Sequence, residues 1–194
     1  MDKSQIRADM HAKLDGLTPA ERHARSLSAC QQLMSTREFK NAQMIMIFMS
    51  MASEVETSTL AVKAWQEGKD IAVPRIDWNG KHMEPVEIRS LDVGMKTTGP
   101  GILEPATGTA ISLGRIDMIV VPGMAFDRRG YRVGRGQGFY DRFLSQQDFR
   151  GIRCALCFHE QILPNPIPAE SHDIPMNLIV TDREVIHVHD HRTQ

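Results

Sequence analysis

The glycine-rich stretch "GYRVGRGQGFYDRFL", residues 130–144, carries the residue types best suited to chemistry on a phosphate group. Gly134, Gly136 and Gly138 alternate with other residues, although ordered glycine is costly because it loses more backbone freedom on folding than any other residue. Successive glycines let backbone N–H groups converge on an oxyanion, and a helix beginning near Gly138 would add its positive end. The spacing therefore indicates a site for a phosphate or a nucleotide.

Charged side chains accompany these glycines. Arg132 and Arg135 can each make two hydrogen bonds to phosphate oxygens, and Asp141 can hold a hard divalent cation against the same phosphates. The stretch is neither a P-loop, since no Gly-Lys-Ser/Thr follows, nor a dinucleotide fingerprint, whose last glycine is replaced by Phe139. Spacing alone leaves a second interpretation open: a tight turn with solvated arginines, in which Asp141 serves only the helix dipole.

The segments that must position this stretch are apolar runs alternating with amphipathic ones. Predicted strands cover residues 42–50, 70–74, 116–123, 152–158 and 177–189, predicted helices begin at residues 3, 18, 57 and 139, and residues 75–115 are short strands and loops. Thr18 and Glu21 predict a capping box, and Pro74 is expected to end its strand. The alternation is typical of an α/β fold with a mostly parallel sheet covered on both faces. We expect a single domain over residues 1–194, with ligands beyond the carboxyl ends of the strands.

The composition and the net charge indicate which kinds of partner the protein has. The chain has 194 residues, of which 41% are hydrophobic and 24% charged, and a net charge of −1, so it has no general attraction for nucleic acid or anionic membranes. Its N-terminus lacks the apolar core of a signal peptide, and its longest apolar runs are too short to span a membrane. We expect a cytoplasmic protein that acts on a small molecule, with no nucleic-acid or membrane partner, as a monomer or weak dimer.

Two groups of residues are of types that could bind a metal ion, but each has a simpler interpretation. Cys154 and Cys157 spell C-x-x-C, but they lie in a predicted strand where positions three apart face opposite sides, so we expect buried thiols and no redox or metal pair. His187, His189 and His191 alternate and could face zinc together, but they lie near the C-terminus, where fraying is common, and we interpret them as a tail.

The segment "VPGMAFDRRGYRVGRGQGFYDRFL" resembles the signature of the 5-formyltetrahydrofolate cyclo-ligase family, also called 5,10-methenyltetrahydrofolate synthetases. Further segments agree in order, so that the similarity covers nearly the whole chain: "KSQIR", "FMSMASEVET", "AVPR", "ILEP", "FHEQI" and "HDIPMN". The resemblance implies a three-layer α/β/α sandwich. It also implies ATP- and Mg²⁺-dependent closure of 5-formyltetrahydrofolate to 5,10-methenyltetrahydrofolate, with release of ADP and phosphate.

Matching motif positions imply three sets of site residues. The ATP site would comprise Lys3, Arg7, Arg132, Gly134, Arg135, Gly136, Gln137, Gly138, Phe139 and Tyr140. The reduced folate would contact Met49, Glu54, Arg135, Gly136, Gln137, Gly138 and Phe139. Asp141 and Asp173 would hold Mg²⁺, and Arg135 and Tyr140 would position the reactants and stabilise charge without a protein nucleophile.

The family mechanism explains why no nucleophile is needed. A formamide carbonyl is a poor electrophile, so its oxygen first attacks the γ-phosphate of ATP. Folate N10 then attacks the activated carbon, and loss of phosphate closes the ring. Such a site needs mainly positioning and charge stabilisation. Glu54 suits the pterin because a carboxylate accepts hydrogen bonds from its amide and amino N–H groups.

Several points stay open at this stage. Gln137 stands where family members often have lysine or glycine, so we expect activity with weaker ATP affinity. We expect Glu56 to be a helix-start charge with Thr57 as the cap, Met44 and Met46 to be core, and Met51 to join Met49 in the folate pocket. His172 is expected to orient or flank Asp173. Two other functions remain: a non-catalytic folate- or nucleotide-binding module, and a related ATP-dependent enzyme for another formylated or pterin substrate.

Overall fold

The computed structural model describes residues 2–98, 101–170 and 172–188. Within these ranges one large sheet has the strand order β12-β11-β9-β6-β1-β2-β3. Its strands are β1 (Met44–Met46), β2 (Asp70–Asp77), β3 (His82–Ile88), β6 (Met118–Val121), β9 (Ile152–Leu156), β11 (Leu178–Val180) and β12 (Val185–His187). The inner strands from β11 to β2 are parallel to their neighbours, and β12 and β3 add antiparallel edges. The mostly parallel sheet is thus confirmed.

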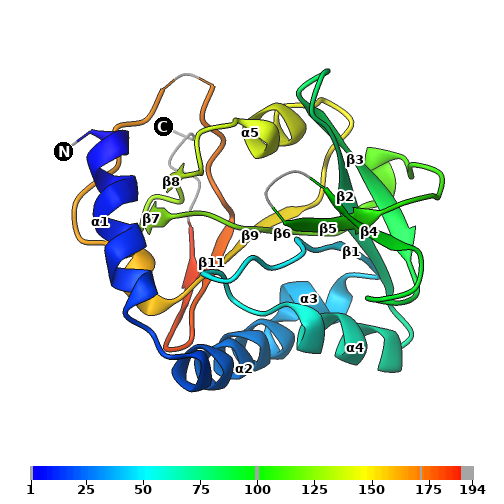
Figure 1. Ribbon diagram of the computed structural model, residues 1–194, viewed down its shortest axis with the longest axis horizontal. Coiled ribbons are helices and arrows are strands. Elements are labelled where there is room, and N and C mark those ends of the chain that lie inside the picture. The colour runs from blue at the N-terminus through cyan, green and yellow to red at the C-terminus, as the bar shows by residue number, and fades with distance from the viewer. Residues whose placement is uncertain (1, 99–100, 171, 189–194) are drawn as a thin grey trace.

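Helices cover both faces of this sheet (Figure 1). They are α1 (Lys3–Asp15), α2 (Pro19–Ser35), α3 (Arg37–Asn41), α4 (Ser58–Gln66) and α5 (Phe139–Leu144), with 3₁₀ turns η1 (Leu113–Arg115) and η2 (His159–Gln161). Figure 1 shows α2, α3 and α4 along the lower face and α5 on the opposite side. The predicted α/β sandwich is confirmed. None of the described helices is long and apolar enough to cross a membrane.

Two small sheets complete the frame. One is the hairpin of β4 (Met95–Thr98) and β5 (Ile102–Pro105), and the other joins β10 (Ile162–Leu163), β7 (Ala125–Asp127) and β8 (Arg132–Val133). Strand β8 runs directly into the glycine loop, residues 134–138, and α5 follows at once. The loop is therefore held at both ends by regular structure.

Local sequence rules account for the helix starts at the N-terminal end. The Asp2 carboxylate accepts a hydrogen bond from Gln5 N at 2.8 Å and caps α1. The predicted capping box of α2 is confirmed, because Glu21 N donates to Thr18 Oγ1 and Thr18 N donates to the Glu21 carboxylate. These caps fix where the two helices begin, and the first turn of α1 carries Lys3.

Two expectations about local structure are wrong. Strand β2 continues past Pro74 to Asp77, because its pairing with β1 stops at Ala72 and the later residues pair with β3 on one side only. A proline is tolerated on such an edge, where its missing N–H is not needed. Thr57 precedes α4 but does not cap it; its hydroxyl donates instead to Phe48 O at 2.7 Å.

The expectations about core residues are confirmed. Met44 and Met46 are 3% and 1% exposed. Cys154 and Cys157 are free and buried, and they pack into separate apolar clusters, as expected for opposite faces of the sheet. Burial raises the pKa of both thiols well above the ordinary value, which favours the protonated thiol over the nucleophilic thiolate.

Candidate active site

A cavity of about 520 Å³ lies beyond the carboxyl ends of β1, β2 and β6, the position expected for a ligand site in a parallel sheet. Its volume falls in the range of small-molecule sites. The cavity is bordered by Lys3, Arg7, Phe48, Met49, Met51, Glu54, Pro74, Ile76, Trp78, Met83, Ile102, Pro122, Gly123, Arg132, Gly134, Arg135, Gly136, Gln137, Gly138, Phe139, Tyr140, Asp141, Glu170, His172 and Asp173. Every residue that the sequence assigned to ATP, folate or Mg²⁺ is among them.

The glycine loop has a backbone that side chains would strain. Gly136 and Gly138 have φ angles of 99° and 67°, in the left-handed region that favours glycine. A methyl group at Gly136 would lie 3.8 Å from the Arg7 guanidinium carbon, which is ordinary contact, so conformation and not crowding requires glycine there. The carbonyl of Gly134 accepts a hydrogen bond from Arg7 Nε at 2.8 Å. Helix α1 therefore holds the loop from one side.

Gly130, at the start of the same sequence motif, has a different task. Its φ is 90°, and an added Cβ would lie 2.7 Å from Met176 O. The backbones are joined there by a hydrogen bond from Met176 N to Gly130 O at 2.9 Å. The density of glycine in this motif thus has two origins, loop conformation at residues 136 and 138 and close backbone packing at residue 130.

Lys3, in the first turn of α1, pairs with two carboxylates that border the cavity. Lys3 Nζ lies 2.8 Å from Asp173 Oδ2 and 3.0 Å from Glu170 Oε1. Partial burial alone would raise the pKa of Asp173, but hydrogen bonds from Lys3 and from Glu170 N outweigh it and hold that pKa below its ordinary value. The Asp173 carboxylate is therefore ionised at neutral pH.

A second ion pair joins β8, before the glycine loop, to α5, after it. Arg132 Nη2 donates to Asp141 Oδ1 at 2.7 Å, and the Arg132 side chain is only 4% exposed. Its Nε is buried without a hydrogen bond among the described residues. The guanidinium carbon lies 5.9 Å from the ring centroid of Tyr140, whose pKa burial raises well above the ordinary range. Tyr140 is consequently a neutral phenol that can donate a hydrogen bond but cannot serve as a base.

A third ion pair crosses the cavity. Arg135 Nε lies 3.1 Å from Glu54 Oε1, and Arg135 Nη2 donates to Ser53 Oγ at 3.0 Å. The other Glu54 oxygen accepts a hydrogen bond from Met51 N at 3.0 Å. The glycine loop is thereby tied to the loop after β1.

The outer wall of the cavity is aromatic. Trp78 and Phe139 meet edge to face, with ring centroids 5.4 Å apart. The Arg142 guanidinium lies 5.3 Å from the Phe139 ring and donates to Gln137 O at 2.8 Å. Sequence reasoning missed Trp78 as a lining residue; the only indication was that its segment follows the predicted strand end at Pro74. It also missed Glu170, for which no sequence pattern pointed to the cavity.

Of three other side chains that the sequence singled out, His172 borders the cavity, whereas Glu56 and His187 do not. Glu56, expected to be a helix-start charge, accepts a hydrogen bond from His23 Nδ1 at 2.7 Å and does not border the cavity. His172 flanks Asp173, with 3.9 Å between Nε2 and Oδ1. His187 Nε2 lies 3.2 Å from Glu38 Oε1, whereas His189 and His191 fall outside the described residues.

The two carboxylates expected to hold Mg²⁺ both border the cavity, and each already meets a cation, Asp141 with Arg132 and Asp173 with Lys3. In the part of the chain that the structure describes, no cluster of three His, Cys, Asp or Glu forms a metal cage. Oxygen ligands are nevertheless the type that Mg²⁺ prefers, and this ion commonly takes only one or two carboxylates beside substrate phosphates. The donor set therefore fits a Mg²⁺ ion that arrives with a phosphate ligand.

Comparisons with known proteins agree with this site. The model of the 5-formyltetrahydrofolate cyclo-ligase family matches residues 1–182. A 5-formyltetrahydrofolate cyclo-ligase of Mus musculus is 33% identical over 92% of both chains, and one of Haemophilus influenzae is 30% identical over 90% of this chain and 94% of its own. The 5,10-methenyltetrahydrofolate synthetase structure of Aquifex aeolicus superposes with a TM-score of 0.85 at 29% identity, covering 100% of this chain and 96% of that one. With residues 1–182 matched by the family model and the motif residues gathered around one cavity, the chain belongs to the 5-formyltetrahydrofolate cyclo-ligase family.

Proposed function

We propose that this chain catalyses the ATP- and Mg²⁺-dependent conversion of 5-formyltetrahydrofolate to 5,10-methenyltetrahydrofolate, with release of ADP and phosphate. One observation carries the proposal beyond family membership. All the residues that the family motifs assign to ATP, folate and metal border a single cavity, although they come from segments as far apart as Lys3 and Asp173.

The phosphate side of the site is supported by its cations. Lys3, Arg7, Arg132 and Arg135 all border the cavity, and Arg132 has a buried N–H without a partner among the described residues. A buried guanidinium with a spare donor is suited to a phosphate oxygen, because an unsatisfied buried donor is costly. We propose that phosphate oxygens replace the carboxylates that Lys3, Arg132 and Arg135 now contact.

The carboxylates released from these cations would then bind the metal ion and the folate. Asp141 and Asp173 would hold Mg²⁺ against the phosphates, where the ion neutralises charge on the transferred phosphoryl group. Glu54, released from Arg135, would accept hydrogen bonds from the pterin N–H groups. Met49 and Phe139 would supply the apolar contacts for the folate.

The proposed reaction needs positioning more than it needs a reactive side chain. The formyl oxygen attacks the γ-phosphorus and ADP leaves; N10 then attacks the phosphorylated carbon, and departure of phosphate with loss of the N10 proton closes the ring. Arg135 would stabilise the phosphoryl charge, and Tyr140 would hold a hydrogen bond as a neutral donor. Tyr140 takes no proton in this scheme, consistent with the raised pKa of its phenol.

A direct assay tests the proposal. Purified protein is mixed with 5-formyltetrahydrofolate and Mg-ATP, and the absorbance of methenyltetrahydrofolate is followed. A rise that requires both ATP and Mg²⁺ is expected. No rise, with ATP binding still detectable by calorimetry, would contradict this substrate assignment and favour a binding module or another formylated substrate.

The proposal extends to the partners, the compartment and the oligomeric state of the enzyme. A small-molecule reaction of this kind requires no nucleic-acid or membrane partner, and we propose a cytoplasmic monomer or weak dimer. Analytical ultracentrifugation over a range of protein concentrations tests the oligomeric state.

A further inference from the structure

Gln161 is a buried polar residue without an assigned task. It ends η2 within the segment "FHEQI", is 3% exposed, and does not border the cavity. Its amide Nε2 donates to Gly123 O at 2.7 Å and to Met124 O at 3.1 Å, while its Oε1 accepts from Phe158 N at 2.7 Å. One side chain thus joins the segment after β9 to the turn between β6 and β7.

That turn is part of the active-site wall. Pro122 and Gly123 border the cavity, and the next residue, Met124, donates its N–H to Val133 O at 2.7 Å. Val133 immediately precedes Gly134, the first residue of the glycine loop. A continuous series of hydrogen bonds therefore runs from Gln161 through Met124 to the base of the phosphate loop.

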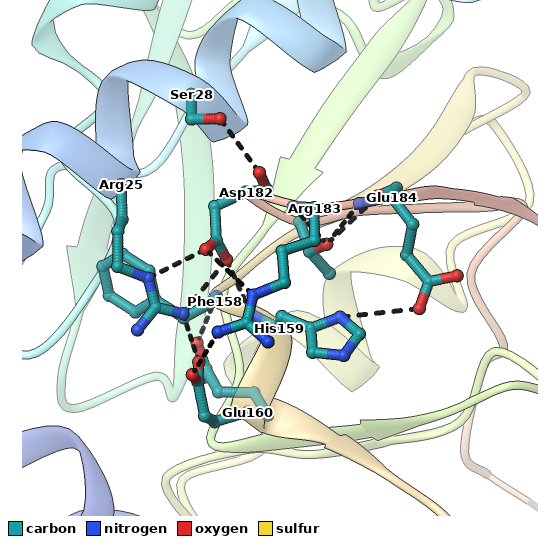
Figure 2. Close-up of polar contacts among 10 residues, drawn as sticks. Arg25, Ser28, Phe158, His159, Glu160, Asp182, Arg183 and Glu184 are labelled. Atoms are coloured by element: carbon teal, nitrogen blue, oxygen red, sulfur yellow. Dashed lines mark hydrogen bonds and ion pairs between the residues drawn. The ribbon is translucent and has the colours of Figure 1, made fainter.

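The turn that carries Gln161 is itself fastened from the other side (Figure 2). His159 N donates to Asp182 Oδ1 at 2.8 Å, and Arg25 of α2 donates to Asp182 Oδ2 at 2.8 Å and also pairs with Glu160. The Arg25 guanidinium lies 5.1 Å from the centroid of the Phe158 ring. Figure 2 shows Arg25 and Asp182 converging on the 158–160 segment, which immediately precedes Gln161 in the chain.

We propose that Gln161 is a positioning residue of the active site: it holds the Gly123–Met124 wall and, through Val133, sets the glycine loop for ATP. The expected effect on KM for ATP rests on the proposed function, whereas the positioning of the turn by Gln161 does not. Without the two amide hydrogens, both carbonyls lose a buried donor and the turn can shift. Displacements of about 1 Å in a positioned site can cost about 100-fold in rate.

A matched control separates positioning from stability. Lys69 is also buried, at 8% exposure, and its Nζ also clamps two carbonyls, Lys40 O at 3.0 Å and Ala42 O at 2.8 Å. It lies at the start of β2, the end of the sheet away from the cavity. Gln161→Met and Lys69→Met each remove a double carbonyl clamp, and only the first faces the site.

KM for ATP and amide hydrogen exchange are measured for both variants, at a temperature where circular dichroism shows that each is folded. Gln161→Met is expected to raise KM for ATP about 10- to 100-fold, with Lys69→Met within about twofold of the parent. Hydrogen exchange is expected to accelerate at the amide of Met124 and across the glycine loop in Gln161→Met alone. Because exchange needs no substrate, it tests the positioning even if the parent does not catalyse the proposed reaction.

The proposal is overturned if exchange at Met124 is unchanged in Gln161→Met, or if both variants lose ATP affinity equally. If Gln161→Met does not fold, Gln161→Asn carries the same test, because the shorter amide cannot keep both carbonyl contacts and the Phe158 contact. A Gln161→Asn protein with parental exchange and parental KM for ATP would equally overturn it.

Discussion

Arg135 and Glu54 form an ion pair across the active-site cavity, with 3.1 Å between Nε and Oε1, although 81 positions separate them in the sequence. In the proposed reaction Arg135 stabilises charge on the phosphates, and Glu54 binds the pterin. The ligand-free protein therefore satisfies each charge with the other. The first substrate to bind must displace this contact, which leaves the partner residue available for the second.

Replacing Glu54 tests the folate side. We expect Glu54→Gln to raise KM for 5-formyltetrahydrofolate about 10- to 100-fold, since a hydrogen bond to a charged group contributes about 1.5–3 kcal/mol. The control is Glu56→Gln, which changes the neighbouring acid that pairs with His23 outside the cavity. Steady-state kinetics at saturating ATP measure both, and an equal effect of the two variants would contradict the assignment of Glu54.

Replacing Asp141 tests the metal side and separates an enzyme from a binding module. Asp141→Asn is expected to lower turnover about 100-fold, the usual scale for removing one group that stabilises transition-state charge. Its stability should fall by only about 1–3 kcal/mol, because the amide oxygen can still accept from Arg132. Asp15→Asn, at the far end of α1, is the control. Unchanged turnover with Mg-ATP would remove Asp141 from the metal site.

A substitution at the exposed loop residue Gln137 should strengthen ATP binding. It borders the cavity, and its backbone carbonyl, not its side chain, is held by Arg142. We expect Gln137→Lys to lower KM for ATP about two- to fivefold, because a partly solvated ion pair contributes up to about 1 kcal/mol. The effect should weaken as salt is added. A raised KM for ATP at low salt would speak against the loop lying beside the phosphates.

Two glycines of one motif should respond differently to alanine. In Gly130→Ala the new methyl group would meet Met176 O at 2.7 Å, so this variant should lose several kcal/mol of unfolding free energy or fail to fold. Gly136→Ala meets no close atom and should lose only about 1–2 kcal/mol, from its positive φ, while ATP binding weakens. Urea unfolding and calorimetry with ATP distinguish them. The reverse order of stabilities would be inconsistent with the packing of Gly130.

The Arg25–Asp182 pair predicts an acid-sensitive part of the stability. Burial opposes ionisation of Asp182, but hydrogen bonds from Arg25 and from His159 N prevail and lower its pKa below the ordinary value of 3.8. A depressed carboxyl pKa contributes stability that is present above the unfolded value and lost as pH falls through the folded one. We expect Asp182→Asn to cost about 3 kcal/mol at pH 7, the scale for breaking a buried ion pair.

The difference between Asp182→Asn and the parent should shrink below about pH 4, as the parent's own carboxylate becomes protonated. Urea midpoints from pH 7 down to about pH 3 measure it. Asp9→Asn, which removes an exposed carboxylate on α1, should cost little at any pH. A difference for Asp182→Asn that grows with acidification would contradict the sign of the shift.

Local sequence patterns were sufficient to predict much of the secondary structure and the fold class. The capping box at Thr18 and Glu21, the opposite faces of Cys154 and Cys157, and the α/β alternation depend on residues a few positions apart, so periodicity and cap chemistry suffice. The strand boundaries were less secure. Continuation of β2 beyond Pro74 depends on which strand lies beside it, and no local pattern encodes that neighbour.

The sequence by itself therefore determined the fold class, the glycine loop with its helix, and the set of charged residue types available for phosphate and metal. Only the tertiary structure decided how the charges meet: Lys3 with Asp173, Arg132 with Asp141 and Arg135 with Glu54. It likewise placed Trp78 on the wall and Gln161 behind it. The reason is physical, because contacts between distant segments follow from strand order and loop path, which the packing of the whole sheet sets at once.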